Sequence, residues 1–249
     1  MSGVQSLERA ILILRIVGQH NRIGIRLIDV TRASRLSQPT AHRILAYLQT
    51  EGLITQHPQN KRYFLGDTLA EFGLCAAMRY EFRDIYRPAL ARLASDSEDT
   101  AFLSRRSGLD LICVDRRSGI HPSKAFVLDV GVRRPLGAGA SGCALLSALP
   151  LDEARAILQE NASAIGLFVT QSIDQTMADI ESFAARGYAL CDHADTDIRS
   201  VAVPFRASGS IGCFSISTFR SRMPDARVPA IVAMLTREVQ RAESRHSDY

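Results

Sequence analysis

Residues 37–48 combine hydrogen-bonding and cationic side chains at the spacing of a helix. Ser37 can cap this helix, and Pro39 falls in its first turn, where a missing amide hydrogen costs little. One side of the helix is apolar and docks, whereas the rest of its surface carries side chains that can touch a partner: Thr40, His42, Arg43, Tyr47 and Thr50. Because arginine can grip guanine through two hydrogen bonds, this pattern is typical of a helix that enters the major groove of DNA.

A second motif, Gly-Ala-Gly-Ala-Ser-Gly at residues 137–142, matches the glycine fingerprint of dinucleotide-binding loops letter for letter. Its context differs, because Arg133, Arg134 and Pro135 stand where a buried strand would have to end. No parallel strand-helix-strand unit opens the chain either. Nucleotide binding is therefore the minor alternative for this loop.

Two further groups of side chains could bind something small. Ser215 and Ser217 are two residues apart on a predicted strand, so their hydroxyls share one face and can converge on one ligand, although a solvent-facing serine row is the alternative. Cys191 and His193, with one of the carboxylates of residues 191–197, could hold a metal ion. Because such close spacing in a loop gives weak geometry, we expect a solvated loop that lines a pocket and no bound metal.

Charge is concentrated at the start of the chain. The 249 residues have a net charge of +4, of which residues 1–66 carry +6 and the remainder −2. This segregation predicts that the first quarter of the chain meets a polyanion. The apolar runs are shorter than the roughly 20 residues that span a bilayer, and the first residues lack a secretory signal pattern, so we expect a cytoplasmic protein without a membrane partner. The five scattered cysteines predict reduced thiols.

The elements around the first motif complete a small DNA-binding unit. Ser6 is a plausible cap for a helix over residues 7–17, and a short helix over 27–33 precedes the turn that contains Ser34. Residues 53–56 and 61–65 predict a β-hairpin with its turn at 57–60. Two helices joined by a tight turn and followed by a hairpin predict a winged helix-turn-helix.

The rest of the chain alternates strands with a few helices. Strands are expected at residues 100–105, 109–116, 125–130, 188–191, 199–205 and 211–219. Ser107-Gly108 and Ser208-Gly209 are expected to turn two hairpins between them. Helices are expected at residues 152–160, 173–186 and 229–242. A connector helix from residue 67 should stop before Pro88, with a second helical stretch over 89–94. Hairpins with flanking helices predict an antiparallel α+β domain.

Residues 4–10, 36–48, 51–54 and 63–66 together resemble the DNA-binding module of the IclR family of bacterial regulators. The similarity continues into the second domain and covers nearly the whole chain. Ser34 departs from the glycine that the family often has in the turn, at some conformational cost. The resemblance implies that Gln38, Thr40 and Arg43 contact base edges, with His42 and Tyr47 as weaker candidates. Phosphate contacts are assigned to three further side chains: Arg26, Lys61 and Arg62.

The same resemblance implies a pocket for a small effector, an organic acid or an aromatic catabolite. The glycine-rich loop then leads into a helix beside the pocket, and that helix begins at residues 143–146. Its terminal amides suit an anion such as a carboxylate. Family members often have lysine in place of Cys143. The implied effector contacts are Leu136, Ala140, Ser141, Asp192, Ser200, Ser215 and Ser217.

The predicted organisation is a winged helix-turn-helix over residues 1–66, a linker helix over 67–87 and a GAF-like effector-binding and oligomerisation domain over 88–249. A regulator of this kind binds operator DNA as a homodimer, or as a pair of dimers, because one reading head recognises too few base pairs. In the family the connector helix helps to form the dimer; packing within one subunit is the alternative. The rivals are an enzyme using the glycine loop or Cys191 and His193, and a DNA binder without an effector. We expect no catalytic residues and no cofactor.

Overall fold

The computed structural model describes residues 2–77, 82–166, 168, 171–193, 196–207 and 210–244. The chain divides into two compact units, residues 1–81 and 82–249. Among the helices in the described part of the chain, none combines the length and apolar character needed to cross a membrane. The expected turn at Ser208-Gly209 and residues 78–81 of the expected linker helix lie outside the described residues.

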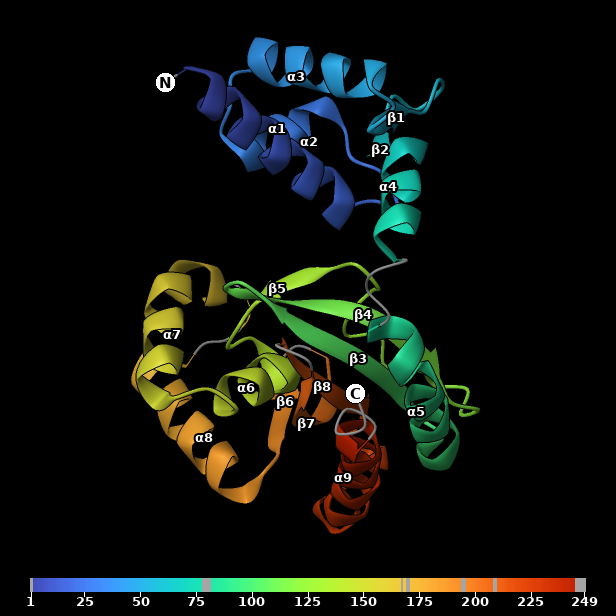
Figure 1. Cartoon of the computed structure of the whole chain (residues 1–249), viewed down its shortest axis with the longest axis vertical. Helices are drawn as coiled ribbons and strands as arrows, with labels where there is room; N and C mark the ends of the chain where they lie inside the picture. The colour runs from blue at the N-terminus through green and yellow to red at the C-terminus, as the bar shows by residue number, and fades with distance from the viewer. Residues whose placement is uncertain are drawn as a thin grey trace. The chain divides into compact units, whose positions relative to one another are not determined.

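The first unit is a three-helix bundle with a two-stranded wing, and a fourth helix follows the wing (Figure 1). Its elements are α1 (Ser2–Gln19), α2 (Leu27–Ser34), α3 (Gln38–Thr50), β1 (Ile54–Gln56), β2 (Tyr63–Leu65) and α4 (Asp67–Ala77). Apolar side chains that recur every three or four residues along the helices form its core. Examples are Ile13 and Val17 of α1, and Ala41 and Leu45 of α3. This periodicity confirms the winged helix-turn-helix.

Three local details of the first unit differ from expectation. Ser6 lies inside α1, which begins at Ser2, so it is not a cap. Ser37 occupies the N-cap position of α3, but its hydroxyl is hydrogen-bonded to Thr40 Oγ1 at 2.8 Å instead of to a backbone amide. Ser34 is helical, and the left-handed residue of the turn is Arg35, with φ of 56°. The conformational cost therefore falls on Arg35, because a side chain strains that backbone conformation.

The second unit contains a six-stranded sheet in the order β5-β4-β3-β8-β7-β6. Its strands are β3 (Thr100–Ser107), β4 (Asp110–Ser118), β5 (Arg133–Pro135), β6 (Ala189–His193), β7 (Ile198–Ala207) and β8 (Ser210–Phe219). Every neighbouring pair is antiparallel. This arrangement confirms the expected antiparallel α+β domain and differs from the parallel sheet that a dinucleotide fingerprint needs.

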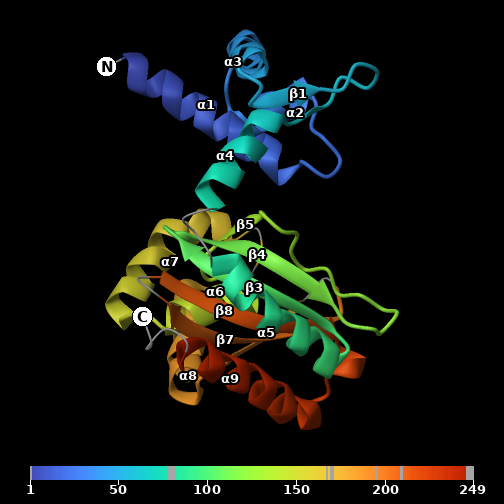
Figure 2. The ribbon, with the colours of Figure 1, turned by 45° about the vertical axis from the view of Figure 1, so that its right-hand side comes forward.

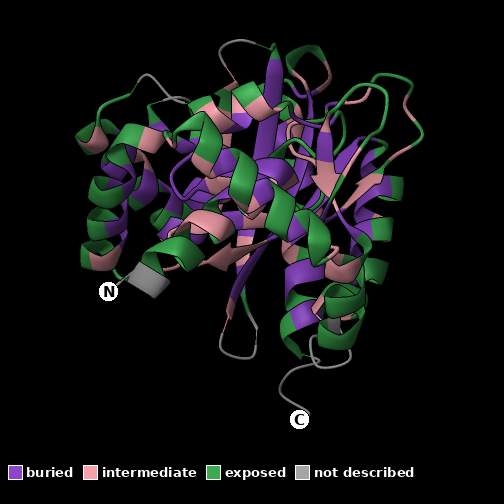
Figure 3. Ribbon diagram, turned by 90° about the horizontal axis from the view of Figure 1, so that it is seen from above, coloured by how far each residue is buried: buried purple, intermediate pink, exposed green. Residues whose placement is uncertain are grey.

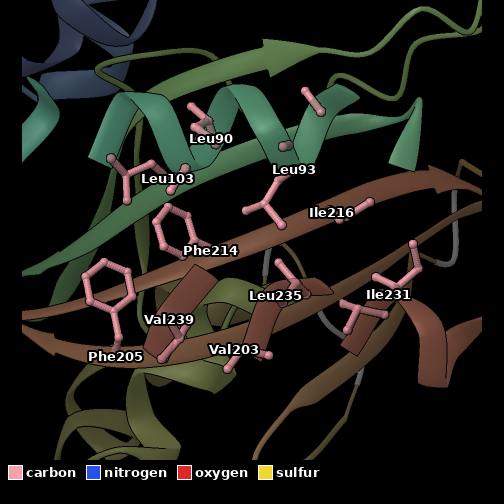
Figure 4. Packing of buried hydrophobic residues seen from close by; sticks show 14 of the residues in the cluster. Leu90, Leu93, Leu103, Val203, Phe205, Phe214, Ile216, Ile231, Leu235 and Val239 are labelled. Carbon is pink, nitrogen blue, oxygen red and sulfur yellow. The ribbon is translucent and has the colours of Figure 1, made fainter. Parts of the chain in front are cut away.

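Helices cover both faces of this sheet (Figure 2). One face packs against α5 (Phe82–Ser97) and α9 (Val228–Ser244), and the other against α6 (Gly139–Ser147), α7 (Leu151–Ile165) and α8 (Ile173–Arg186). Figure 3 shows the strands mostly buried between helices whose outer faces are exposed. In the first core, Leu90 and Leu93 of α5 and Leu235 of α9 meet Leu103 and Phe214 of the sheet (Figure 4).

Two predicted elements of this unit are wrong. Residues 125–130 form no strand, and the short strand beside β4 is instead β5, which pairs Arg133 with Ile112. The helix α5 does not restart after Pro88 but runs through it. A proline inside a helix costs about 3 kcal/mol, and the burial of Tyr86 and Leu90 on either side of it offsets that cost.

Candidate functional site

The outward face of α3 is free of the core. Ala41, Leu45 and Leu48 are buried against the other helices, because they recur at three- and four-residue spacing. The side chains assigned to base contact lie on the remaining surface: Gln38, His42, Arg43 and Tyr47 are exposed, and Thr40 is half-buried. Tyr47 is 66% exposed, so its ring is accessible to a partner on this face.

The three side chains assigned to phosphates occupy two places. Ile25 and Tyr63 form an antiparallel bridge through two backbone hydrogen bonds of 3.1 and 2.8 Å. Arg26 and Arg62 are the residues next to this bridge, so positions 36 residues apart in the chain become neighbours. Arg62 also donates from Nη1 to the carbonyl of Gly24 at 2.7 Å, and Arg26 is exposed. Lys61 is exposed at the hairpin turn.

In the second unit the serines are buried, and their hydroxyls bond to one another. Ser215 and Ser217 alternate along β8, and Ser200 lies directly opposite Ser217 on β7. The hydroxyls of Ser200 and Ser217 are 2.7 Å apart, and Ser141 of α6 donates to Ser215 at 3.0 Å. A solvent-facing serine row is therefore the wrong description, since α6 covers this face of the sheet.

His193 extends this polar row to the edge of the sheet. Its Nε2 lies 3.0 Å from Ser200 Oγ. Burial lowers the pKa of His193 below its usual 6.5, and the positive charge of Arg134 lowers it further, whereas Asp192 opposes the shift. The ring is therefore neutral at pH 7 and can serve the serine as either donor or acceptor.

The glycine-rich loop brings the start of α6 against this row. Gly139 has φ of +67°, and a Cβ there would lie 3.5 Å from His193 Cε1. No side chain caps the first turn of α6, so its free amides are next to the polar row. Leu136 and Ala140 are buried around it. Gly137 and Gly139 are thus needed for their left-handed backbone, and Gly142 for close packing against Gly137.

Asp192 does not join this group. Successive side chains on a strand point to opposite faces, so Asp192 leaves the face that carries Cys191 and His193. Its two carboxylate oxygens accept from Arg199 at 2.6 and 3.0 Å, and Arg220 lies 3.1 Å away. The hydrogen bonds from Arg199 lower its pKa. Within the described ranges no three histidine, cysteine or acidic side chains are grouped to hold a metal ion.

Two further residues belong to this region, and sequence reasoning missed them. Arg134 of β5 is half-buried, donates to the carbonyl of Val127 and stacks over the ring of Phe168, and burial lowers its pKa. Thr100 lies opposite Ser217 and is 1% exposed, and in the described part of the structure its hydroxyl has no hydrogen-bond partner. The alternation of side chains along the strand could have placed Thr100 on this face. The sequence gives no such signal for Arg134, because Arg134 lowers the pKa of His193 from the opposite edge of the sheet.

Comparisons with known proteins agree along the length of the chain. Residues 6–58 match the IclR helix-turn-helix domain, and residues 75–244 match the domain described as bacterial transcriptional regulator IclR C-terminal. The HTH-type transcriptional regulator XynR of Escherichia coli is 29% identical over 238 residues, which cover 92% of this chain and 91% of XynR.

Solved structures share the fold. A crystal structure of an IclR-type regulator from Silicibacter sp. TM1040 is similar with a TM-score of 0.80 and 22% identity, over 96% of this chain and 95% of that chain. An IclR homologue from Microbacterium hydrocarbonoxydans, complexed with 4-hydroxybenzoate, is similar with a TM-score of 0.74 and 22% identity, over 98% of this chain and all of that one. Since the C-terminal match alone covers more than half of the residues, the chain belongs to the IclR family of bacterial, DNA-binding transcriptional regulators.

Proposed function

We propose that the chain binds operator DNA as a homodimer, or as a pair of dimers, and that a small organic anion modulates this binding. The observation that carries the proposal is that one chain has both an exposed, cationic face on α3 and a buried row of hydroxyls under α6. The first suits a DNA groove, and the second suits a ligand enclosed by protein.

The base-reading residues in this proposal are Gln38, Thr40 and Arg43, with His42 and Tyr47 beside them. All five lie on α3 away from its core face. Phosphate contacts fall to three residues outside α3: Arg26 and Arg62 beside the bridge, and the exposed Lys61. Phosphate contacts add salt-sensitive affinity without selecting a sequence.

The proposed effector is a carboxylic acid, aliphatic or aromatic. The free amides at the start of α6 and the cation of Arg134 favour a carboxylate, and the buried hydroxyls of Ser141 and Ser215 can donate to it. The ligand has to replace the 3.0 Å bond between these two hydroxyls with bonds of its own. The complex of a similar protein with 4-hydroxybenzoate supports an acid of this type.

Exposed apolar side chains in the first unit support the dimer. Leu7 and Val4 on α1 are more than half exposed, as are Phe72 and Leu74 on α4. We infer that these apolar side chains are covered by the partner subunit in the dimer. A homodimer then reads two half-sites, and an effector changes operator affinity only through its different affinities for two arrangements of the dimer.

The DNA arm of the proposal is tested with Arg43→Ala, using Arg32→Ala on α2 as a matched exposed control. Binding to DNA from the chain's own genomic neighbourhood and to random DNA is measured by fluorescence anisotropy at two salt concentrations. Loss of a bidentate base contact costs about 1–3 kcal/mol, or roughly 5- to 150-fold in affinity, on the specific site only. Equal losses on both DNAs would make Arg43 a phosphate contact, and salt-independent binding would refute the DNA surface.

The effector arm is tested by thermal shift with a panel of carboxylic acids that includes 4-hydroxybenzoate. An acid that binds only the native state raises the melting temperature, and the stabilisation grows with the logarithm of one plus the ratio of its concentration to its Kd. Ser141→Ala and Ser215→Ala should remove that shift and leave DNA affinity in the absence of ligand unchanged. An undiminished shift in both variants would place the ligand elsewhere.

A further inference from the structure

Two cysteines that the proposed function does not use face each other across the α6 and β6 contact. Gly139 of α6 lies against His193 of β6, as the 3.5 Å approach of a Cβ to the ring shows. Cys143 is one helical turn beyond Gly139 on the same side, which advances it by about 6 Å. Cys191 precedes His193 by two strand residues on the same face, which advances it by about 6.6 Å. These equal steps place Cys143 beside Cys191.

Side-chain contacts agree with this placement. The thiol of Cys143 donates to the carbonyl of Gly137 at 3.4 Å, and a hydrogen bond with the Cys191 thiol, together with burial, raises the pKa of Cys143. Both residues pack in the core that α6, α7 and α8 form on the sheet. Cys143 is fully enclosed, whereas Cys191 is partly exposed at an edge strand. A reagent from solution therefore reaches Cys191 first.

The other buried pair of cysteines provides an internal comparison. Cys113 and Cys213 both lie opposite Ser104, on the two strands that flank it. Strands are about 4.8 Å apart, so their Cα atoms are separated by roughly 9–10 Å. A disulfide needs Cα atoms within about 7 Å. This separation rules out a disulfide between Cys113 and Cys213, so the candidate pair is the one on α6 and β6.

We propose that an organic hydroperoxide oxidises Cys143 and Cys191 to an intramolecular disulfide that ties α6 to β6. The thiolate of Cys191 attacks a peroxide oxygen, the O–O bond breaks, and the departing alkoxide takes a proton to become an alcohol. Cys143 Sγ then attacks the sulfenic sulfur of Cys191, and hydroxide leaves with the proton of Cys143 as water. Two thiols and one hydroperoxide thus give one disulfide, one alcohol and one water.

The bond would fix two walls of the polar row. Ser141 lies on α6 two residues before Cys143, and His193 lies on β6 two residues after Cys191. One consequence rests on the proposed function. An effector has to separate the hydroxyls of Ser141 and Ser215, and the disulfide restrains that separation.

The test uses the full chain with Cys75→Ser, because Cys75 is exposed and could cross-link two copies. The protein is treated with cumene hydroperoxide, denatured, blocked and digested with trypsin. The expected result is loss of two of the four remaining thiols and a peptide of residues 134–155 joined to one of residues 187–199, reversed by dithiothreitol. Linkage through Cys113 or Cys213, a cross-linked dimer, or no loss of thiols overturns the proposal.

Variants check the order of the two steps. In Cys143→Ala, Cys191 should accumulate as a sulfenic acid that dimedone traps, and in Cys191→Ala both disulfide and trapped product should be absent. Cys213→Ala is the control and should form the same linked peptide as its parent. Dimedone capture at Cys143 in place of Cys191 would contradict the mechanism. The peptide map involves neither DNA nor effector, so its failure and the failure of the proposed function are seen separately.

Discussion

Gly137 supports the loop that positions α6, and its replacement by alanine tests that role. Its φ is +99°, and an added Cβ would lie 2.5 Å from Leu158 Cδ2 and 2.9 Å from Ile165 Cδ1. Gly187, at the end of α8, has φ of +82° and nothing within 4 Å of the same added atom. The pair of substitutions therefore shares the backbone strain and differs in the contact with α7.

The two costs can be separated in magnitude. A side chain on left-handed backbone costs about 1–2 kcal/mol, and alanine returns roughly 0.4–1 kcal/mol by restricting the unfolded chain. Gly187→Ala should therefore lower the free energy of unfolding by about 1 kcal/mol. Forcing a methyl group into a packed core adds about 1–3 kcal/mol, so Gly137→Ala should lose about 2–4 kcal/mol.

Urea unfolding followed by circular dichroism measures both variants, since the chain has no tryptophan to report by fluorescence. The m-value should match that of the parent if only native-state stability has changed. A loss in Gly137→Ala within about 0.5 kcal/mol of that in Gly187→Ala would refute the argument from packing against Leu158 and Ile165. The loop would then need another explanation for its first glycine.

Three further outcomes are expected. Because the native pKa of His193 lies below 6.5, the unfolded chain binds a proton at a higher pH than the folded chain does. The contribution of this shift to the free energy of unfolding is therefore present above pH 6.5 and declines as the pH falls below that value. In urea titrations, His193→Gln should lose less of its free energy of unfolding than the parent between pH 7.5 and 5.5. Asp99→Asn should cost about 3 kcal/mol in thermal melts, since the fully buried carboxylate accepts from Arg222 at 2.9 Å and Arg227 at 2.7 Å, and an unchanged melting temperature would show the network to be dispensable. Asn161→Ala should cost about 1–3 kcal/mol by the same assay, because its buried amide donates to the carbonyls of Leu109 at 2.7 Å and Leu136 at 3.3 Å, and both bonds would be lost.

Elements with strong local signals could be predicted from sequence. The bounds of α8 follow from Ser172, which forms a capping box with Gln175, and from Gly187, which ends the helix on left-handed backbone. The faces of α3 follow from its apolar spacing alone. These features depend on residues within one or two turns of one another, so no distant contact is needed to read them.

Other features depend on residues that are far apart in the sequence. Helix propensity ends α5 at Pro88, but the burial of Tyr86 and Leu90 against the sheet carries the helix through it. An apolar run at residues 125–130 has the composition of a strand, yet the place beside β4 is taken by β5. Pairing partners decide whether such a run becomes a strand.

The sequence by itself determined the winged helix-turn-helix, the outward face of α3 and the antiparallel class of the second unit, because periodicity and turn residues act locally. Only the tertiary structure decided that Ser215 and Ser217 are buried under α6, that Asp192 turns away to Arg199, and that Cys143 meets Cys191. Burial and charge at these positions come from elements dozens of residues away, and spacing along the chain carries no record of which element covers which face.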